Sequence, residues 1–156
     1  MLNVKNPYNV TLRWLVCAVL MAVPGPVAAD LARLQTTELN IHISGVDTDK
    51  GVVQYGLYNT AETFPGRDGR VAKGEVRASQ DGVKIVIKGL KPGYYAVAAF
   101  HDENLNDSFD QGFLGIPLEN YGFSNDARGF FKAPDFEDAR FSVSGRKTTI
   151  SFTLGR

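Results

Sequence analysis

Oxygen-bearing side chains recur at alternate residues within one short stretch, His101–Asp110, which reads HDENLNDSFD. The carboxylates and carboxamides in it belong to Asp102, Asn104, Asn106 and Asp110. Calcium-binding loops place oxygen ligands of these types at alternate positions around the ion. The spacing therefore predicts a Ca²⁺ site with these four side chains as ligands.

Two positions depart from the twelve-residue loop of an EF-hand. Counted from Asp102, position six is Asp107 instead of glycine, and position twelve is Phe113 instead of a bidentate glutamate. A looser extracellular loop remains compatible if a remote carboxylate, such as Glu119 or Asp126, completes the shell. The alternative is a loop without an ion, because Asn and Asp side chains also hold turns by bonding nearby backbone amides.

The same stretch contains the only candidate for a general base, His101, which lies beside Asp102. A histidine next to a carboxylate can accept a proton in catalysis, but the chain has no G-x-S-x-G motif, and Ser124 has no evident base. The second histidine, His42, is distant in sequence, so the ligands of a zinc site are missing as well. We therefore predict no catalytic residue, with a hydrolase that uses the His101–Asp102 region as the alternative.

Aromatic and polar residues alternate with glycines in the segment 113–131. Aromatic rings stack on sugars or on partner side chains, and carboxamides add directional hydrogen bonds. The candidate ligand-binding residues are Tyr121, Phe123, Asn125 and Arg128, and the expected partner is a protein or a carbohydrate. Alternatively, the rings form a small core beneath the loop.

The elements that would position these residues are short strands, since apolar residues alternate with polar ones in most of the remaining chain. The expected strands are 39–43, 52–57, 75–78, 83–87, 93–100, 139–143 and 149–154. Residues 93–100 are apolar on both faces and follow a Pro92-Gly93 turn, so they should form a central strand. The pattern predicts an all-β fold, an antiparallel β-sandwich of about seven strands, immunoglobulin-like or prealbumin-like. The irregular loop 102–134 should lie at one end of it.

The first 29 residues have the composition of a signal peptide. Lys5 and Arg13 precede ten consecutive apolar residues, Trp14–Val23, which is half of the roughly 20 needed to span a bilayer. Cleavage after Ala29 would remove Cys17 and leave residues 30–156 as a single domain without a transmembrane segment. This predicts an exported protein, periplasmic or extracellular, that stabilises itself by its core or by a bound ion instead of disulfides.

Charge composition excludes one class of partner. The whole chain has 17 basic and 17 acidic residues, and the expected signal peptide contains two of the basic residues and no acidic one. The mature chain is therefore slightly acidic and contains no basic cluster that would neutralise phosphates. We expect no nucleic-acid partner.

Three blocks in order, HDENLNDSFD, GIPLENYGFSNDARG and FEDARF, resemble the bacterial domain of unknown function 2141. The resemblance extends from about Leu39 to Leu154, with Leu105 and Asp107 standing where the loop of that family has small residues, often glycine. LKPGYYAV is also similar to an element of transthyretin-type sandwiches. The resemblance implies an exported bacterial β-sandwich and no catalytic residues, since the family has no established activity. Together these features predict a non-enzymatic ligand- or partner-binding module of the periplasm or cell envelope, stabilised by Ca²⁺.

Overall fold

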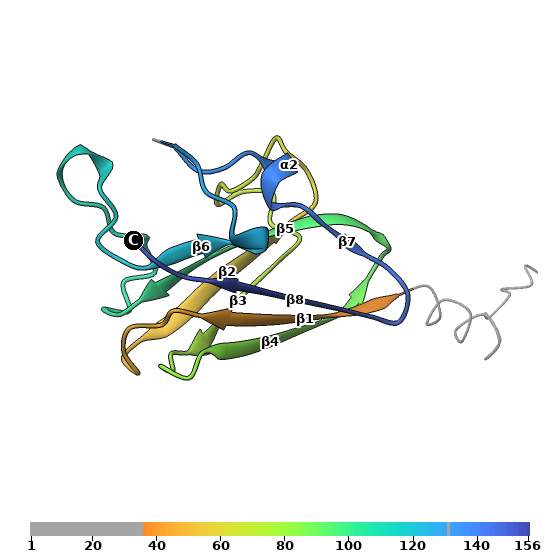
Figure 1. Ribbon diagram of the computed structural model, residues 1–156, viewed down its shortest axis with the longest axis horizontal. Helices are drawn as coiled ribbons and strands as arrows, with labels where there is room; N and C mark the ends of the chain where they lie inside the picture. Colours follow the sequence, from red (N-terminus) through yellow and green to blue (C-terminus); the bar gives the residue numbers. More distant parts are fainter. Residues whose placement is uncertain (1–35, 131) are drawn as a thin grey trace, which may run out of the picture.

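The computed structural model describes residues 36–130 and 132–156, in which eight strands form two packed β-sheets (Figure 1). The expected signal peptide, with Cys17, lies outside the described residues. The all-β sandwich predicted from the alternation of apolar residues is confirmed. Within the described ranges, no helix is long and apolar enough to cross a membrane.

The smaller sheet has the strand order β4–β1–β8, with bounds Val83–Leu90, Thr37–Ser44 and Lys147–Thr153. β1 pairs with β4 in antiparallel fashion and with β8 in parallel fashion. The parallel pair is a difference from the wholly antiparallel sandwich expected from the sequence. It arises because the chain reaches β8 from the larger sheet. No hairpin joins β8 to β1, so no tight turn forces the two strands to be antiparallel.

The larger sheet has the order β3–β2–β5–β6, and a further strand, β7, pairs with the start of β5. The bounds of these strands are Ala72–Arg77 for β3, Val52–Tyr58 for β2, Gly93–Asp102 for β5, Tyr121–Phe123 for β6 and Phe141–Val143 for β7. β5 is therefore the central strand, as its two apolar faces predict.

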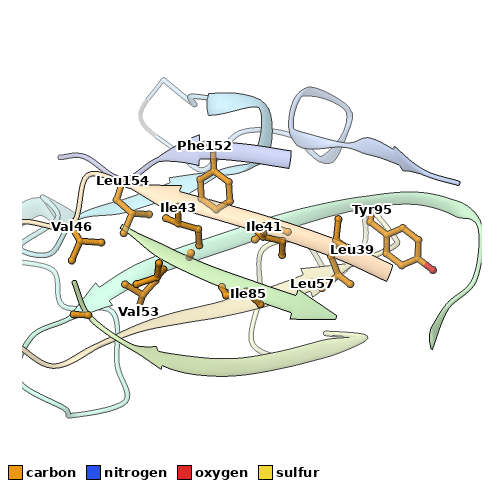
Figure 2. Close-up of a cluster of buried hydrophobic side chains, with 14 of the residues drawn as sticks. Leu39, Ile41, Ile43, Val46, Val53, Leu57, Ile85, Tyr95, Phe152 and Leu154 are labelled. Carbon is orange, nitrogen blue, oxygen red and sulfur yellow. The ribbon is translucent and has the colours of Figure 1, made fainter. Parts of the chain in front are cut away.

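The main core fills the space between the two sheets (Figure 2). Leu39, Ile41 and Ile43 of β1 face Val53 and Leu57 of β2, and all five side chains are buried. Burial of each such side chain stabilises the fold by about 1.5–3 kcal/mol. The alternation that revealed these strands in the sequence is thus the alternation between core and solvent.

A second core lies on the opposite face of the larger sheet, where small residues let the long loop pack closely. It contains Tyr58, Ala96, Phe123, Ala127, Phe136 and Ala139. Two short elements cover it, η2 (Ser124–Asp126) and α2 (Phe136–Ala139). The strand expected to begin at residue 139 instead begins at Phe141, because the preceding residues form the turn of α2.

The expected core beneath the long loop forms only in part. Phe123 is buried, but Phe113 and Phe130 are 86% and 85% exposed. Phe113 opens a short 3₁₀ turn, η1 (Phe113–Gly115), in the segment that projects from the sheets and is closed by a bridge between Gln111 and Pro117. Figure 1 shows this loop extending beyond β6, where it has no sheet to pack on.

Candidate functional site

The polar loop begins where β5 ends, and Asp102 anchors it. This side chain is 0% exposed, and its Oδ1 accepts a hydrogen bond from the Asn106 amide at 3.2 Å. Its Oδ2 accepts hydrogen bonds from the Asp107 amide at 3.0 Å and from Gln54 Nε2 of β2 at 2.9 Å. The carboxylate therefore fixes the loop to the central strand and to the neighbouring strand at once.

The remaining predicted ligands converge on Asp110. Asn104 Nδ2 donates to Asp110 Oδ2 at 2.7 Å, and Asn106 Nδ2 donates to Oδ1 and Oδ2 at 3.0 and 3.1 Å. Since Asn106 also bonds Asp102, the structure brings together all four residues that the alternate spacing singled out. In this arrangement the amide hydrogens of the two asparagines face the Asp110 carboxylate and close the loop on it.

The loop makes its sharp turns without glycine. Leu105 and Asp107 have φ angles of 60° and 58°, in the left-handed region. A side chain in this region costs roughly 1–2 kcal/mol per residue. Asp107 is held in place by Gln54 Nε2, which donates to its Oδ1 at 2.9 Å, and by Arg67 Nη2, which donates to its carbonyl at 2.6 Å.

Glu119 is the remote carboxylate that lies beside this loop. It is 7% exposed, its Oε2 accepts a hydrogen bond from the Asp110 amide at 3.0 Å, and its buried Oε1 has no partner among the described residues. Burial raises the pKa of Glu119, and the charges of Asp110 and Asp102 raise it further, against the opposing effect of the Asp110 and Glu103 amides. The Glu103 amide favours the ionised form of Glu119, but it is not placed to donate a hydrogen bond to Oε1.

The other expected remote carboxylate lies elsewhere, since Asp126 Oδ1 accepts a hydrogen bond from the Thr153 amide of β8 at 2.7 Å. Across residues 36–130 and 132–156, no three His, Cys, Asp or Glu side chains are arranged to hold a metal ion by themselves. Asp102, Asp110 and Glu119 therefore do not form a metal site by themselves, and the carboxamides of Asn104 and Asn106 lie among them.

His101 does not face an open cleft. It is 1% exposed, its Nε2 lies 2.7 Å from the Lys50 carbonyl, and its Nδ1 lies 3.9 Å from Glu103 Oε1. His42 lies on β1 in the other sheet. The geometry gives His101 a place in the packing of β5 against the turn before β2.

A groove of about 1030 Å³ lies on the outer face of the larger sheet. Its walls come from the connection between β2 and β3 and from the loop between β5 and β6. Four cationic residues line it, Arg67, Arg70, Lys73 and Lys132, against two acidic residues, Glu75 and Asp107. The groove therefore has an excess of positive charge although the mature chain as a whole is expected to be slightly acidic.

Aromatic rings in edge-to-face contact form the floor of this groove. The ring centroids of Phe100 and Phe109 are 5.6 Å apart, those of Phe109 and Tyr121 5.4 Å, and those of Tyr121 and Phe123 5.9 Å. Phe100, Phe109 and Tyr121 are half-buried, so each presents part of its ring to the groove. Two of the predicted ligand-binding residues, Tyr121 and Phe123, thus line the groove.

The other two predicted ligand-binding residues do not. Asn125 Nδ2 donates to the carbonyls of Asp138 and Arg140 at 3.2 and 2.8 Å, which ties η2 to α2. Arg128 is exposed outside the groove lining. The residues that sequence reasoning missed are the cations at positions 67, 70 and 73, whose spacing of three was visible in a connection that showed no periodicity.

Tyr58 holds in place the groove wall that comes from the connection between β2 and β3. Its hydroxyl lies 3.0 Å from the Pro65 carbonyl and 2.8 Å from the Gly66 carbonyl, so it donates to the connection that leads to Arg67 and Arg70. Burial raises the pKa of Tyr58, and the neighbouring Arg70 charge partly opposes the rise. The neutral phenol is therefore the form that the folded protein favours.

Comparison with known proteins agrees with the resemblance seen in the sequence. No curated protein matches the chain. A profile of the bacterial family described as "Uncharacterized protein conserved in bacteria (DUF2141)" matches residues 41–151. That range extends from within β1 to within β8 and includes the polar loop, Glu119 and the aromatic floor of the groove. The chain belongs to this bacterial family.

Proposed function

We propose that the protein is an exported, non-enzymatic binding module whose groove takes an acidic carbohydrate. The observation that carries the proposal is the combination of partly exposed rings on the groove floor with an excess of cations on its walls. Aromatic faces pack against the apolar faces of sugar rings, and cations attract their carboxylate or phosphate groups. Neither feature alone would select this class of ligand.

Three of the four cations form no ion pair within the described residues, and one of them, Arg67, uses Nη2 to hold the Asp107 carbonyl at 2.6 Å. The Lys73 ammonium makes no hydrogen bond or ion pair there, and Arg70 uses only Nε, which donates to the Arg67 carbonyl at 2.8 Å. By contrast, Lys132 is paired with Asp135 at 2.7 Å. Arg70 and Lys73 are therefore the residues that we expect to meet the anionic group of the ligand.

The shape of the groove favours a saccharide over an acyl chain. The groove is partly open to solvent and charged residues line it, whereas an acyl chain is bound best where apolar walls enclose it. Gln54 and Gln111 line the groove, and the carbonyl oxygen of Gln54 and the amide group of Gln111 can bond sugar hydroxyls.

Binding is favoured over hydrolysis because His101, the alternative general base, is buried and does not line the groove. A general base must come within hydrogen-bond reach of the proton that it abstracts.

Export is supported by the composition of residues 1–29, and it would bring the groove into contact with the polysaccharides of the cell envelope or its surroundings.

The test is calorimetric titration of the protein, purified after export, with oligouronides of about four to six sugar units and with neutral oligosaccharides of equal length. Acidic sugars should bind, and binding should weaken with salt because the anionic contacts are screened. Arg70→Ala and Lys73→Ala should each weaken binding about fivefold or more, while Lys84→Ala, an exposed lysine of β4, should not. Equal binding of neutral sugars, or an unchanged affinity in both groove variants, would contradict the proposal.

A further inference from the structure

A buried carboxylate oxygen beside the polar loop has no hydrogen-bond donor in the described part of the chain. Glu119 is 7% exposed, and its Oε1 is without a partner among the described residues, while Oε2 is held by the Asp110 amide at 3.0 Å. A buried acceptor without a donor is destabilising, and an ionised one more so. The charges of Asp110 and Asp102 also act on Glu119, so these three carboxylates lie close enough to repel one another.

The three carboxylates still have room for a cation. Each carboxylate has about four acceptor positions. Asp102 uses three, for two backbone amides and Gln54, and Asp110 uses three, for the side-chain amides of Asn104 and Asn106. Glu119 uses one.

The two carboxamides also retain acceptor capacity. Asn104 Oδ1 accepts a hydrogen bond from the Asn106 amide at 3.1 Å, and Asn106 Oδ1 accepts one from the Ser108 amide at 2.8 Å. Each carbonyl oxygen has a second lone pair. The side-chain amide groups that now bond Asp110 would be replaced by the ion, since both compete for the same carboxylate oxygens.

We propose that Asp102, Asn104, Asn106, Asp110 and Glu119 bind Ca²⁺ at the end of β5. These are hard oxygen ligands without a histidine or cysteine, the set that Ca²⁺ prefers, and backbone carbonyls and water complete its six to eight contacts. Glu119 takes the part of the glutamate that the loop lacks at its twelfth position, where Phe113 stands. Three carboxylates outweigh the charge of the ion, so binding relieves their mutual repulsion.

The experiment titrates the full protein, first freed of metal with EGTA, with CaCl₂ alone while heat and melting temperature are recorded. A dissociation constant of about 10⁻⁴ to 10⁻³ M is expected, as for extracellular calcium modules, with a rise of several degrees in melting temperature that EGTA reverses. MgCl₂ at equal concentration should act less, because Mg²⁺ demands a tighter octahedral shell. No saccharide is present, so the outcome is independent of the proposed function.

Two variants locate the site. Glu119→Gln keeps the size of the side chain but removes its charge, and should weaken Ca²⁺ binding about tenfold or more without lowering the melting temperature measured in EGTA. Asp110→Asn should weaken it likewise and carries the test if the first variant does not fold. Glu137→Gln is the matched control, because that carboxylate lies on α2 and pairs with Arg140 at 2.9 Å.

Three outcomes would overturn the site. The first is the absence of heat and of any melting shift up to about 10 mM CaCl₂. The second is a Glu119→Gln protein that responds to Ca²⁺ as the unaltered protein does. The third is an equal loss in Glu137→Gln, which would indicate diffuse attraction of cations to acidic residues and not a defined site.

Discussion

Asp102 is the fully buried anchor of the polar stretch. Its buried carboxylate accepts three hydrogen bonds, two from loop amides and one from Gln54 on β2. Asp102→Ala would leave these three donors without their acceptor, so we expect a loss of about 2–4 kcal/mol in the free energy of unfolding. Urea denaturation measures this loss in EGTA, and Asn104→Ala, an exposed neighbour, should lose about 1 kcal/mol or less. Equal losses in the two variants would contradict the anchoring role.

Tyr58 gives a second prediction at this scale, through pH. The raised pKa means that the folded protein binds the phenolic proton more tightly than the unfolded chain does. The stability contributed by the neutral phenol is therefore fully present below the ordinary pKa of about 10 and is lost as pH rises from there through the folded value. Between about pH 9 and 11 the unaltered protein should lose stability more steeply than Tyr58→Phe, measured by urea denaturation. Parallel pH profiles would show that the hydroxyl contributes nothing.

At the scale of elements, β2 supplies Gly56 to the groove lining, next to Arg70. A methyl group added at Gly56 would lie 2.6 Å from Arg70 Cδ and 2.9 Å from Tyr58 Oη, so both side chains would have to move. Gly56→Ala should weaken binding of acidic oligosaccharides several-fold and lower stability by about 1–3 kcal/mol, because the Tyr58 side chain is buried. Calorimetric titration measures the affinity. Gly93→Ala is the matched control, because its methyl would lie 3.6 Å from the nearest atom, in Tyr95, and it should bind normally.

Some of these elements could be predicted from the sequence, and others could not. Strands with one face in the core, such as β1 and β4, were readable because burial alternates with period two. The polar cluster at the end of β5 was also readable, since its members are close in sequence. The helical turn α2 was not, because its four residues are too few to show a period, and neither was the groove. Its cations and its rings come from distant segments that meet only in the folded chain.

For the whole molecule, we predict that the exported protein begins at Asp30 and has no thiol. Cleavage after Ala29 removes Cys17, the one cysteine of the chain. Mass spectrometry of the protein recovered from the cell envelope or the periplasm would determine its first residue, and a thiol assay after unfolding should give no signal. A recovered chain that retains Cys17, free or carrying a lipid, would contradict this prediction.

The parallel pairing of β8 with β1 also governs when the molecule can fold. Thr37 Oγ1 donates to the Gly145 carbonyl across 108 positions of sequence, and β8 then pairs along the length of β1. The middle strand of the smaller sheet therefore lacks one neighbour until Lys147–Thr153 has been synthesised. Contacts between such distant segments form slowly, because a long loop must close first. Because β8 follows every strand of the larger sheet in sequence, the smaller sheet is the last part of the sandwich to be completed.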